Sequence, residues 1–224
     1  DPPKNIKLLA PWPDTLATDT FRKGFVDELA ASCKLIRFMD WGNTNNSTIE
    51  EWSERSTLTS QEWTGATGIP YEAMIELCNL SGCDAWICIP HMASDDFVQQ
   101  LAELIEAELD SPLKCWVEYS NECWNFGFTQ ATYCSDVLRT TFGVANWQHA
   151  YGIRAGQIIQ IFKNVLGERC VGVIAGQAAS PSSTLTQALN GSEIDGVQLA
   201  DVAAIAPYFA NDLADELDTF VQAN

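Results

Sequence analysis

Two glutamates in the segment 116–122 have the residue type and the spacing that acid–base chemistry needs. If the segment is an extended strand, alternation places four side chains on one face: Trp116, Glu118, Ser120 and Glu122. Two carboxylates close to an arginine, here Arg37, form a site able to shift the pKa of a carboxyl group. A purely structural ion pair between Arg37 and Glu118 explains the same pattern equally well.

Further polar and aromatic residues follow this apolar run and others of the chain, at points where a strand would end. They are Trp12, Asp40, Trp41, His91, Asn121, Trp124 and Tyr208. Burying polar side chains costs free energy unless they satisfy one another or a ligand. In a βα barrel the carboxyl ends of the strands meet at one face, so we expect these residues to surround one site.

Apolar runs typical of strands alternate with helical periodicity along the whole chain. We expect strands at 6–12, 34–39, 84–90, 114–120, 170–175 and 202–206. We expect helices at 19–31, 71–80, directly after Ser94, and at 129–140, 147–166, 183–189 and 212–223. The strands are almost continuously apolar, which is typical of a parallel sheet that is covered on both faces.

This order predicts an α/β fold, a (β/α)8 TIM barrel present as about six βα units in a single domain, 1–224. The other architecture is a doubly wound open sheet. The first strand-to-helix turn, Pro11-Trp-Pro-Asp14, lacks the glycines of a nucleotide-binding loop, which counts against that sheet. A complete six-unit domain with an unrelated function also stays open.

The residues at these strand ends resemble those of clan A glycoside hydrolases, most closely the cellulase-like and mannanase-like families. In that clan the fourth strand ends in Asn-Glu, as in Glu118-Tyr-Ser-Asn121-Glu122 here. Three further positions are similar in the same order: Arg37 on the second strand, His91 after the third and Tyr208 ending the sixth. The resemblance covers essentially all 224 residues but only six of the eight barrel units.

The resemblance implies a role for each of these side chains. Glu122 would be the general acid/base, and Asn121 would bind the 2-hydroxyl group of the sugar. Arg37 and Tyr208 would keep the nucleophile ionised and oriented. His91 would bind a sugar hydroxyl or a neighbouring carboxylate.

Other residues would support or extend this site. Glu118 and Asp40 would orient the residues that touch the substrate, while Trp12, Trp41 and Trp124 would stack on sugar rings. We expect a different place, in the core, for three other tryptophans: Trp86, Trp116 and Trp147.

The nucleophile of the clan is a glutamate that ends a seventh strand. Glu193 precedes the sixth strand and Glu216 lies in the last helix, so neither can replace it. We expect the nucleophile beyond residue 224, from the rest of the chain, and we expect the present segment alone to be inactive. The rest of the chain, or another chain, would complete the barrel.

The predicted function is that of a retaining glycoside hydrolase acting on a neutral β-linked polysaccharide or oligosaccharide, with no cofactor and no metal. The alternative is a non-catalytic relative: a glycan-binding or structural glycoprotein of an extracellular assembly.

The charge of the chain narrows the range of partners. Its formal net charge is −18, with only 12 lysines and arginines, which argues against nucleic acid, acidic lipid surfaces and polyanionic substrates. No apolar run reaches the length that would cross a bilayer. A carbohydrate without charge is the partner that fits best.

Eight cysteines, without CxxC spacing and with only two histidines, disfavour a zinc site and favour disulfides in a secreted protein. Cys123 with Cys134 and Cys78 with Cys83 are short-range candidates for pairing. Buried free thiols are the alternative. Four Asn-x-Ser/Thr patterns, at Asn45, Asn46, Asn79 and Asn190, are compatible with an extracellular glycoprotein.

Overall fold

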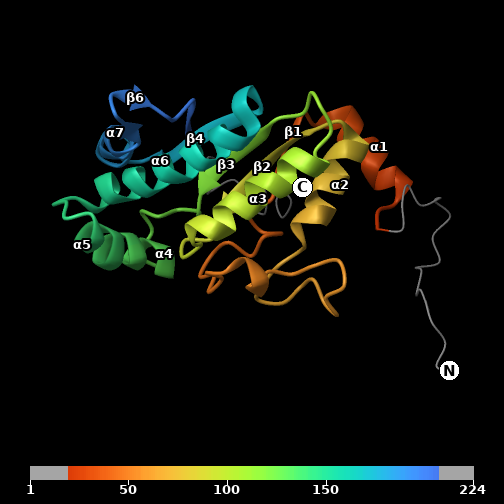
Figure 1. Ribbon diagram of the computed structural model, residues 1–224, viewed down its shortest axis with the longest axis horizontal. Coiled ribbons are helices and arrows are strands. Elements are labelled where there is room, and N and C mark those ends of the chain that lie inside the picture. The colour runs from red at the N-terminus through yellow and green to blue at the C-terminus, as the bar shows by residue number, and fades with distance from the viewer. Residues whose placement is uncertain (1–19, 207–224) are drawn as a thin grey trace, which may run out of the picture.

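The computed structural model describes residues 20–206 of the chain (Figure 1). The expected strand 6–12, the expected helix 212–223 and the site candidates Trp12 and Tyr208 lie outside the described residues. Five strands form one sheet in the order β1-β2-β3-β4-β7. They are β1 (Leu35–Arg37), β2 (Asp84–Ile89), β3 (Cys115–Tyr119), β4 (Cys170–Gln177) and β7 (Val202–Ala206).

All four pairings within this sheet are parallel, and neighbours in the sheet are also successive strands of the predicted series. The sheet curls like half of a barrel, and helices pack against its convex face (Figure 1). The prediction of a parallel α/β fold is therefore confirmed for the described residues. The described residues form five strands of this sheet and do not show a closed barrel of eight strands.

The long helices lie where the periodicity predicts them, with starts that differ from the predicted ones by up to four residues. They are α1 (Lys23–Ser32), α2 (Tyr71–Ser81), α3 (Asp95–Glu108), α6 (Trp147–Leu166) and α7 (Pro181–Gly191). The Ser94 hydroxyl accepts a hydrogen bond from the Phe97 backbone N–H, and Asn146 caps α6 in the same way. Gly82, at φ +66°, ends α2 in the left-handed conformation that glycine tolerates best.

The segment expected as one helix at 129–140 is helical but not uniform. It consists of α4 (Thr129–Thr132), the π-helix η2 (Tyr133–Leu138) and α5 (Arg139–Thr141). Two single 3₁₀ turns, η1 (Trp52–Glu54) and η3 (Gly167–Arg169), complete the helical elements of the described chain.

A small antiparallel hairpin was not expected from the sequence. It joins β5 (Glu193–Ile194) to β6 (Val197–Gln198) through Asp195 and Gly196, which both have positive φ. Asp-Gly is the preferred pair for such a turn, so the dipeptide itself was the signal that could have found it.

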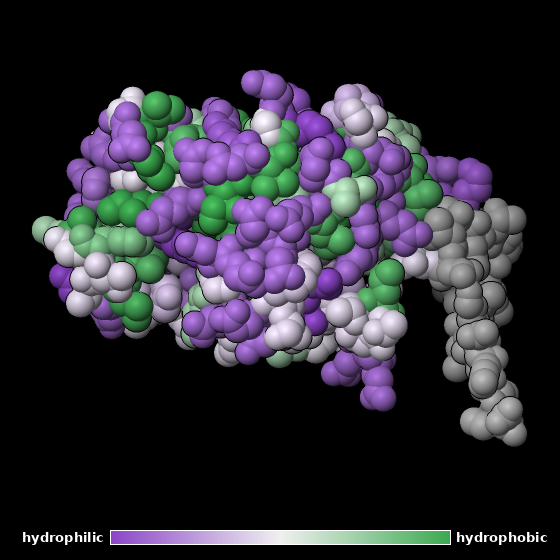
Figure 2. All heavy atoms as spheres, in the orientation of Figure 1, coloured by the Kyte–Doolittle hydropathy of each residue, from purple (hydrophilic) through white to green (hydrophobic). Residues whose placement is uncertain are grey.

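The hydrophobic core lies between the convex face of the sheet and the helices. Its fully buried side chains include Ile87, Ile89, Val117 and Tyr119 from the strands, and Phe97, Leu101, Ile158 and Phe162 from the helices. On the face turned toward the viewer, hydrophilic residues cover much of the surface, with hydrophobic residues showing between them (Figure 2). Within residues 20–206 no helix has the length and apolarity to cross a membrane.

The concave face of the sheet carries two tryptophans that we expected in the core. Trp86 and Trp116 are only partly buried, and their rings stack with centroids 5.8 Å apart. The correction follows from strand alternation, because Ala85, Ile87 and Ile89 already occupy the face that the helices cover. The third, Trp147, does pack partly buried against the core.

The eight cysteines are free thiols, seven of them buried, and no two lie at disulfide distance. The pairs Cys123–Cys134 and Cys78–Cys83 are therefore not bonded in the structure. Five of the thiols belong to the buried core cluster and fill space there as small apolar side chains do: Cys78, Cys115, Cys123, Cys134 and Cys170. This is the alternative that the sequence left open.

Three of the four possible glycosylation asparagines have side chains that are engaged by the protein itself. Those of Asn45, Asn46 and Asn79 hydrogen bond to other parts of the chain. Asn190 is exposed near the end of α7. Asn46 is exposed as well, but its Oδ1 accepts a hydrogen bond from the Thr129 backbone N–H. Glycosylation stays a prediction.

Candidate functional site

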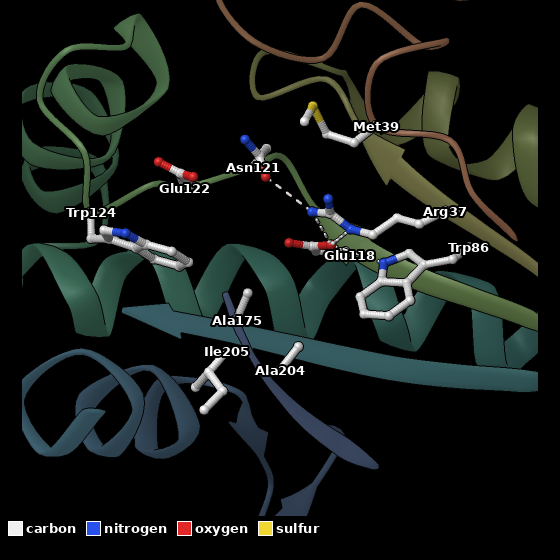
Figure 3. A pocket seen from close by; sticks show the side chains of 10 residues that line it. All are labelled: Arg37, Met39, Trp86, Glu118, Asn121, Glu122, Trp124, Ala175, Ala204 and Ile205. Carbon is white, nitrogen blue, oxygen red and sulfur yellow. Dashed lines mark hydrogen bonds and ion pairs between the residues drawn. The ribbon is translucent and has the colours of Figure 1, made fainter. Parts of the chain in front are cut away.

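A cavity of about 300 Å³ opens at the carboxyl ends of the strands, on the concave side of the sheet (Figure 3). It is lined by Arg37, Met39, Trp86, Glu118, Asn121, Glu122, Trp124, Ala175, Ala204 and Ile205. These residues come from all five strands or from the loops that follow them. The structure thus brings Arg37, Glu118, Asn121, Glu122 and Trp124 together, as the sequence predicted.

Glu118 is the most buried charged residue of this cavity, with 2% of its surface exposed. Its Oε2 accepts hydrogen bonds from Arg37 Nε at 3.0 Å, from the Arg37 terminal nitrogen at 2.8 Å and from Trp86 Nε1 at 2.8 Å. The Cys88 thiol lies 3.5 Å from the same oxygen. The Arg37 guanidinium also lies over the Trp86 ring, 5.2 Å from its centroid.

The free-energy cost of removing this ion pair from water is unequal for its two partners. Burial raises the pKa of Glu118, although Arg37 and the hydrogen bonds act to lower it. The side chain of Arg37 is one-third exposed (33%). Burial alone would lower its pKa, but the negative groups around it, Glu118 among them, leave its pKa raised. The buried partner therefore carries most of the desolvation penalty.

Asn121 connects the ion pair to a network of side-chain amides. Its Oδ1 accepts a hydrogen bond from Arg37 at 3.0 Å, and its Nδ2 donates to Asn45 Oδ1 at 3.0 Å. Gln130, which is fully buried, donates both to Asn45 Oδ1 at 2.7 Å and to the Asn121 carbonyl at 2.8 Å. The network joins the loop after β1 to the loop after β3, and it fixes the orientation of Asn121.

Glu122 reaches the cavity by a route that strand alternation does not describe. The strand ends at Tyr119, and Ser120 and Glu122 both have positive φ, at +57° and +43°. The expectation that alternation continues to Glu122 is therefore wrong beyond Tyr119. Left-handed backbone is unfavourable for residues other than glycine, and such strain is concentrated at functional sites.

The carboxylate of Glu122 is held at the rim of the cavity. Asn125 Nδ2 donates to its Oε2 at 2.9 Å, and the Asn125 Oδ1 accepts from the Gly127 backbone N–H at 3.0 Å. Glu122 is half-buried, unlike Glu118. In Figure 3 it lies beside Trp124, across the cavity from Arg37 and Trp86. A half-buried carboxylate facing an open cavity is placed to exchange protons with a ligand.

His91 does not belong to the lining of this cavity. Its side chain is 4% exposed, its Nδ1 has no hydrogen-bond partner, and its ring lies edge-on to Tyr133 with centroids 5.2 Å apart. Burial lowers the pKa of His91 to about 4, so the ring is neutral near pH 7. The His91 carbonyl accepts a hydrogen bond from the Tyr119 hydroxyl at 2.8 Å, which ties the ends of β2 and β3 together.

Asp40 and Trp41 also lie apart from the cavity. They line a shallower hollow of about 190 Å³ with Trp63 and the chain around Gly65–Gly68. The Trp41 ring stacks on Phe21 and packs at an angle against Phe38. Backbone turns after β1 carry both residues away from the strand end.

Three residues of the site were missed as functional candidates. Trp86 was expected in the core, and Asn45 and Gln130 lie in or beyond loops whose contacts are remote in sequence. The alternation Asp84-x-Trp86-x-Cys88 was a signal that could have placed Trp86 on the same face as Glu118. No comparable signal marks Asn45 or Gln130.

The chemistry available here is that of carboxylate, guanidinium, amide and indole groups. Among residues 20–206 there is no cluster of three or more histidine, cysteine, aspartate or glutamate side chains that could hold a metal ion. Comparisons with family models, with curated proteins and with solved structures returned no match for this chain.

Proposed function

We propose that the chain is part of a (β/α)8 barrel that hydrolyses a neutral β-linked glycan with retention of configuration, and that Glu122 is its general acid/base. The observation that carries the proposal is the meeting of Glu122, Asn121, Arg37 and Trp124 around one cavity at the strand ends. A cavity with a half-buried carboxylate, amides and indole rings suits a polar, uncharged ligand that has apolar C–H faces.

The proposed reaction has two steps. A carboxylate attacks the anomeric carbon, the glycosidic C–O bond breaks, and Glu122 gives its proton to the departing oxygen. Water then attacks the same carbon, Glu122 takes the proton of that water, and the bond to the carboxylate breaks. Glu122 ends the cycle protonated, as it began.

Glu118 is poorly suited to be the attacking carboxylate. Burial raises its pKa, which opposes the ionised state that a nucleophile needs, and Arg37 and Trp86 occupy its Oε2. We therefore propose that the nucleophile comes from beyond residue 224, at about 5–5.5 Å from Glu122 as in retaining enzymes.

Glu122→Gln in the full-length protein tests the assignment. We expect hydrolysis of cello-, manno- and xylo-oligosaccharides to fall by about 100-fold or more, since the amide cannot supply a proton. The loss should be much smaller for a dinitrophenyl glycoside, because that leaving group departs without protonation. The free energy of unfolding should change by less than about 0.5 kcal/mol.

Glu118→Gln is the matched control, four positions earlier and still within β3. Removing the charge from a buried ion pair should cost about 2 kcal/mol of unfolding free energy, measured by urea denaturation. If Glu122→Gln loses that stability while keeping full activity on all substrates, the carboxylate is structural and the proposal is wrong.

Glycan binding without hydrolysis is the second candidate. Hydrolysis with retention needs two carboxylates. Within residues 20–206 the cavity is lined by one half-buried carboxylate, that of Glu122, and by Glu118, which is held in an ion pair with Arg37. Binding of the same oligosaccharides with no turnover by the full-length protein would select it.

A further inference from the structure

A second cavity, of about 360 Å³, adjoins the first along the loop that follows β3. It is lined by Glu122, Trp124, Asn125, Phe126 and Gln177. Glu122 and Trp124 line both cavities. Glu122 therefore lies on the boundary between two chambers and not at the bottom of one closed pocket.

The side chains around Glu122 fix it in this boundary position. Asn125, which lines only the second cavity, holds the Glu122 carboxylate by its Nδ2 at 2.9 Å. In Figure 3, Glu122 and Trp124 close one end of the first cavity, opposite Arg37 and Trp86. A ligand that fills both cavities would pass directly beside the carboxylate.

The second cavity combines an aromatic ring with amide groups. Phe126 is 58% exposed, and Trp147 supports it edge-on with ring centroids 5.7 Å apart. Gln177 lies at the end of β4 and lines the same cavity. Its exposed side-chain amide provides a hydrogen-bond donor and a hydrogen-bond acceptor. A supported apolar ring next to amides is suited to a sugar, which has C–H faces and hydroxyl edges.

We propose that the Phe126–Gln177 cavity is a second sugar subsite, on the leaving-group side of Glu122, and that the site therefore takes an internal linkage of an extended glycan. This inference rests on the proposed function. The catalytic carboxyl groups of glycosidases flank the bond that breaks, so a proton donor between two cavities implies sugar rings on both sides of it. A closed pocket would admit only a chain end.

The test measures binding of β-1,4-linked disaccharides and pentasaccharides of glucose, mannose and xylose by calorimetry, in the full-length Glu122→Gln variant. We expect at least one pentasaccharide to bind about 10-fold more tightly than its disaccharide. Adding Phe126→Ala should weaken that pentasaccharide by about fivefold and leave the disaccharide within about twofold. Phe25→Ala is the matched control, because Phe25 is also an exposed ring (42%) but lies on α1.

Pentasaccharides that bind no better than disaccharides, or no binding at all, would overturn the subsite. So would equal affinity of the Phe126→Ala and Phe25→Ala proteins. The proposed hydrolysis fails separately: if Glu122→Gln keeps full activity but Phe126→Ala still removes the gain from length, the subsite stands as a glycan-binding groove. If Glu122→Gln is inactive and Phe126→Ala changes nothing, only the subsite is wrong.

Discussion

Glu118 and Glu122 are close in the chain, and the backbone between them gives them different surroundings. Glu118 is still on the regular strand, so it faces Trp86 and Arg37 across the sheet and becomes buried. Glu122 lies beyond the strand, where Ser120 and Glu122 both have left-handed backbone geometry, and its carboxylate stays at the rim. One glutamate is therefore suited to hold the loops together and the other to meet a ligand.

His91 should leave a signature in the pH dependence of stability. Its pKa is lowered to about 4 by burial, from 6.5 in an unfolded chain. Between these values the unfolded state binds more protons, so the stabilisation is complete above pH 6.5 and is lost as the pH falls to 4. We expect a loss of roughly 2 kcal/mol, allowing for solvent screening.

His91→Phe, which keeps a ring against Tyr133, isolates this contribution. The unfolding free energies of the two proteins are compared by urea denaturation at pH 7 and pH 4, so that effects of the other titrating groups cancel. The wild-type protein should lose stability relative to the variant on acidification. A difference that does not vary with pH would mean that the ring titrates normally.

At the level of the elements, the packing of α6 against α7 requires their backbones to approach closely. A Cβ atom added to Gly152 of α6 would overlap the carbonyl oxygen of Ala188 in α7, and Gly191 makes a similar approach from the other side. The contact holds α7 beside β4, whose end carries Ala175 and Gln177 into the two cavities. Glycines here serve packing and not turn formation.

Gly152→Ala should therefore destabilise the protein, although alanine favours helices. The helices must separate to admit the methyl group, and we expect a cost of about 2 kcal/mol in unfolding free energy. Thr186→Ala, at an exposed position of α7, is the control and should change stability by less than about 0.5 kcal/mol. Thermal or urea unfolding measures both, and a stabilised Gly152→Ala protein would show that the interface is loose.

For the molecule as a whole, the thiols report on the packing of the core. Burial raises the pKa of Cys78, Cys88, Cys115, Cys123 and Cys170, which keeps them protonated and unreactive while the protein is folded. Cys33 is the one cysteine that is only half-buried. The fold thus predicts slow labelling in the native state.

Labelling with a thiol reagent, without reductant, tests this. We expect about one fast-reacting thiol in the folded protein, Cys33, and all eight after unfolding. Fewer than eight in the unfolded protein would reveal disulfides that the structure does not contain, and would support the expectation of a secreted protein. The count is made by mass spectrometry of the labelled chain.

Local patterns in the sequence predicted the five strands of the sheet and the long helices within residues 20–206, because period-two and period-3.6 burial are properties of a short stretch of chain. They did not predict the β5–β6 hairpin. They also determined that Glu118, Asn121 and Glu122 sit at a strand end, since the apolar run stops there. Only the tertiary structure decided which side chains meet. Asn45 and Gln130 reach Asn121 across more than one loop, Trp86 turns to the concave face, and His91 turns away from the cavity. Such contacts depend on the curl of the sheet and on the path of each loop. Both are determined by residues that lie far apart in the sequence.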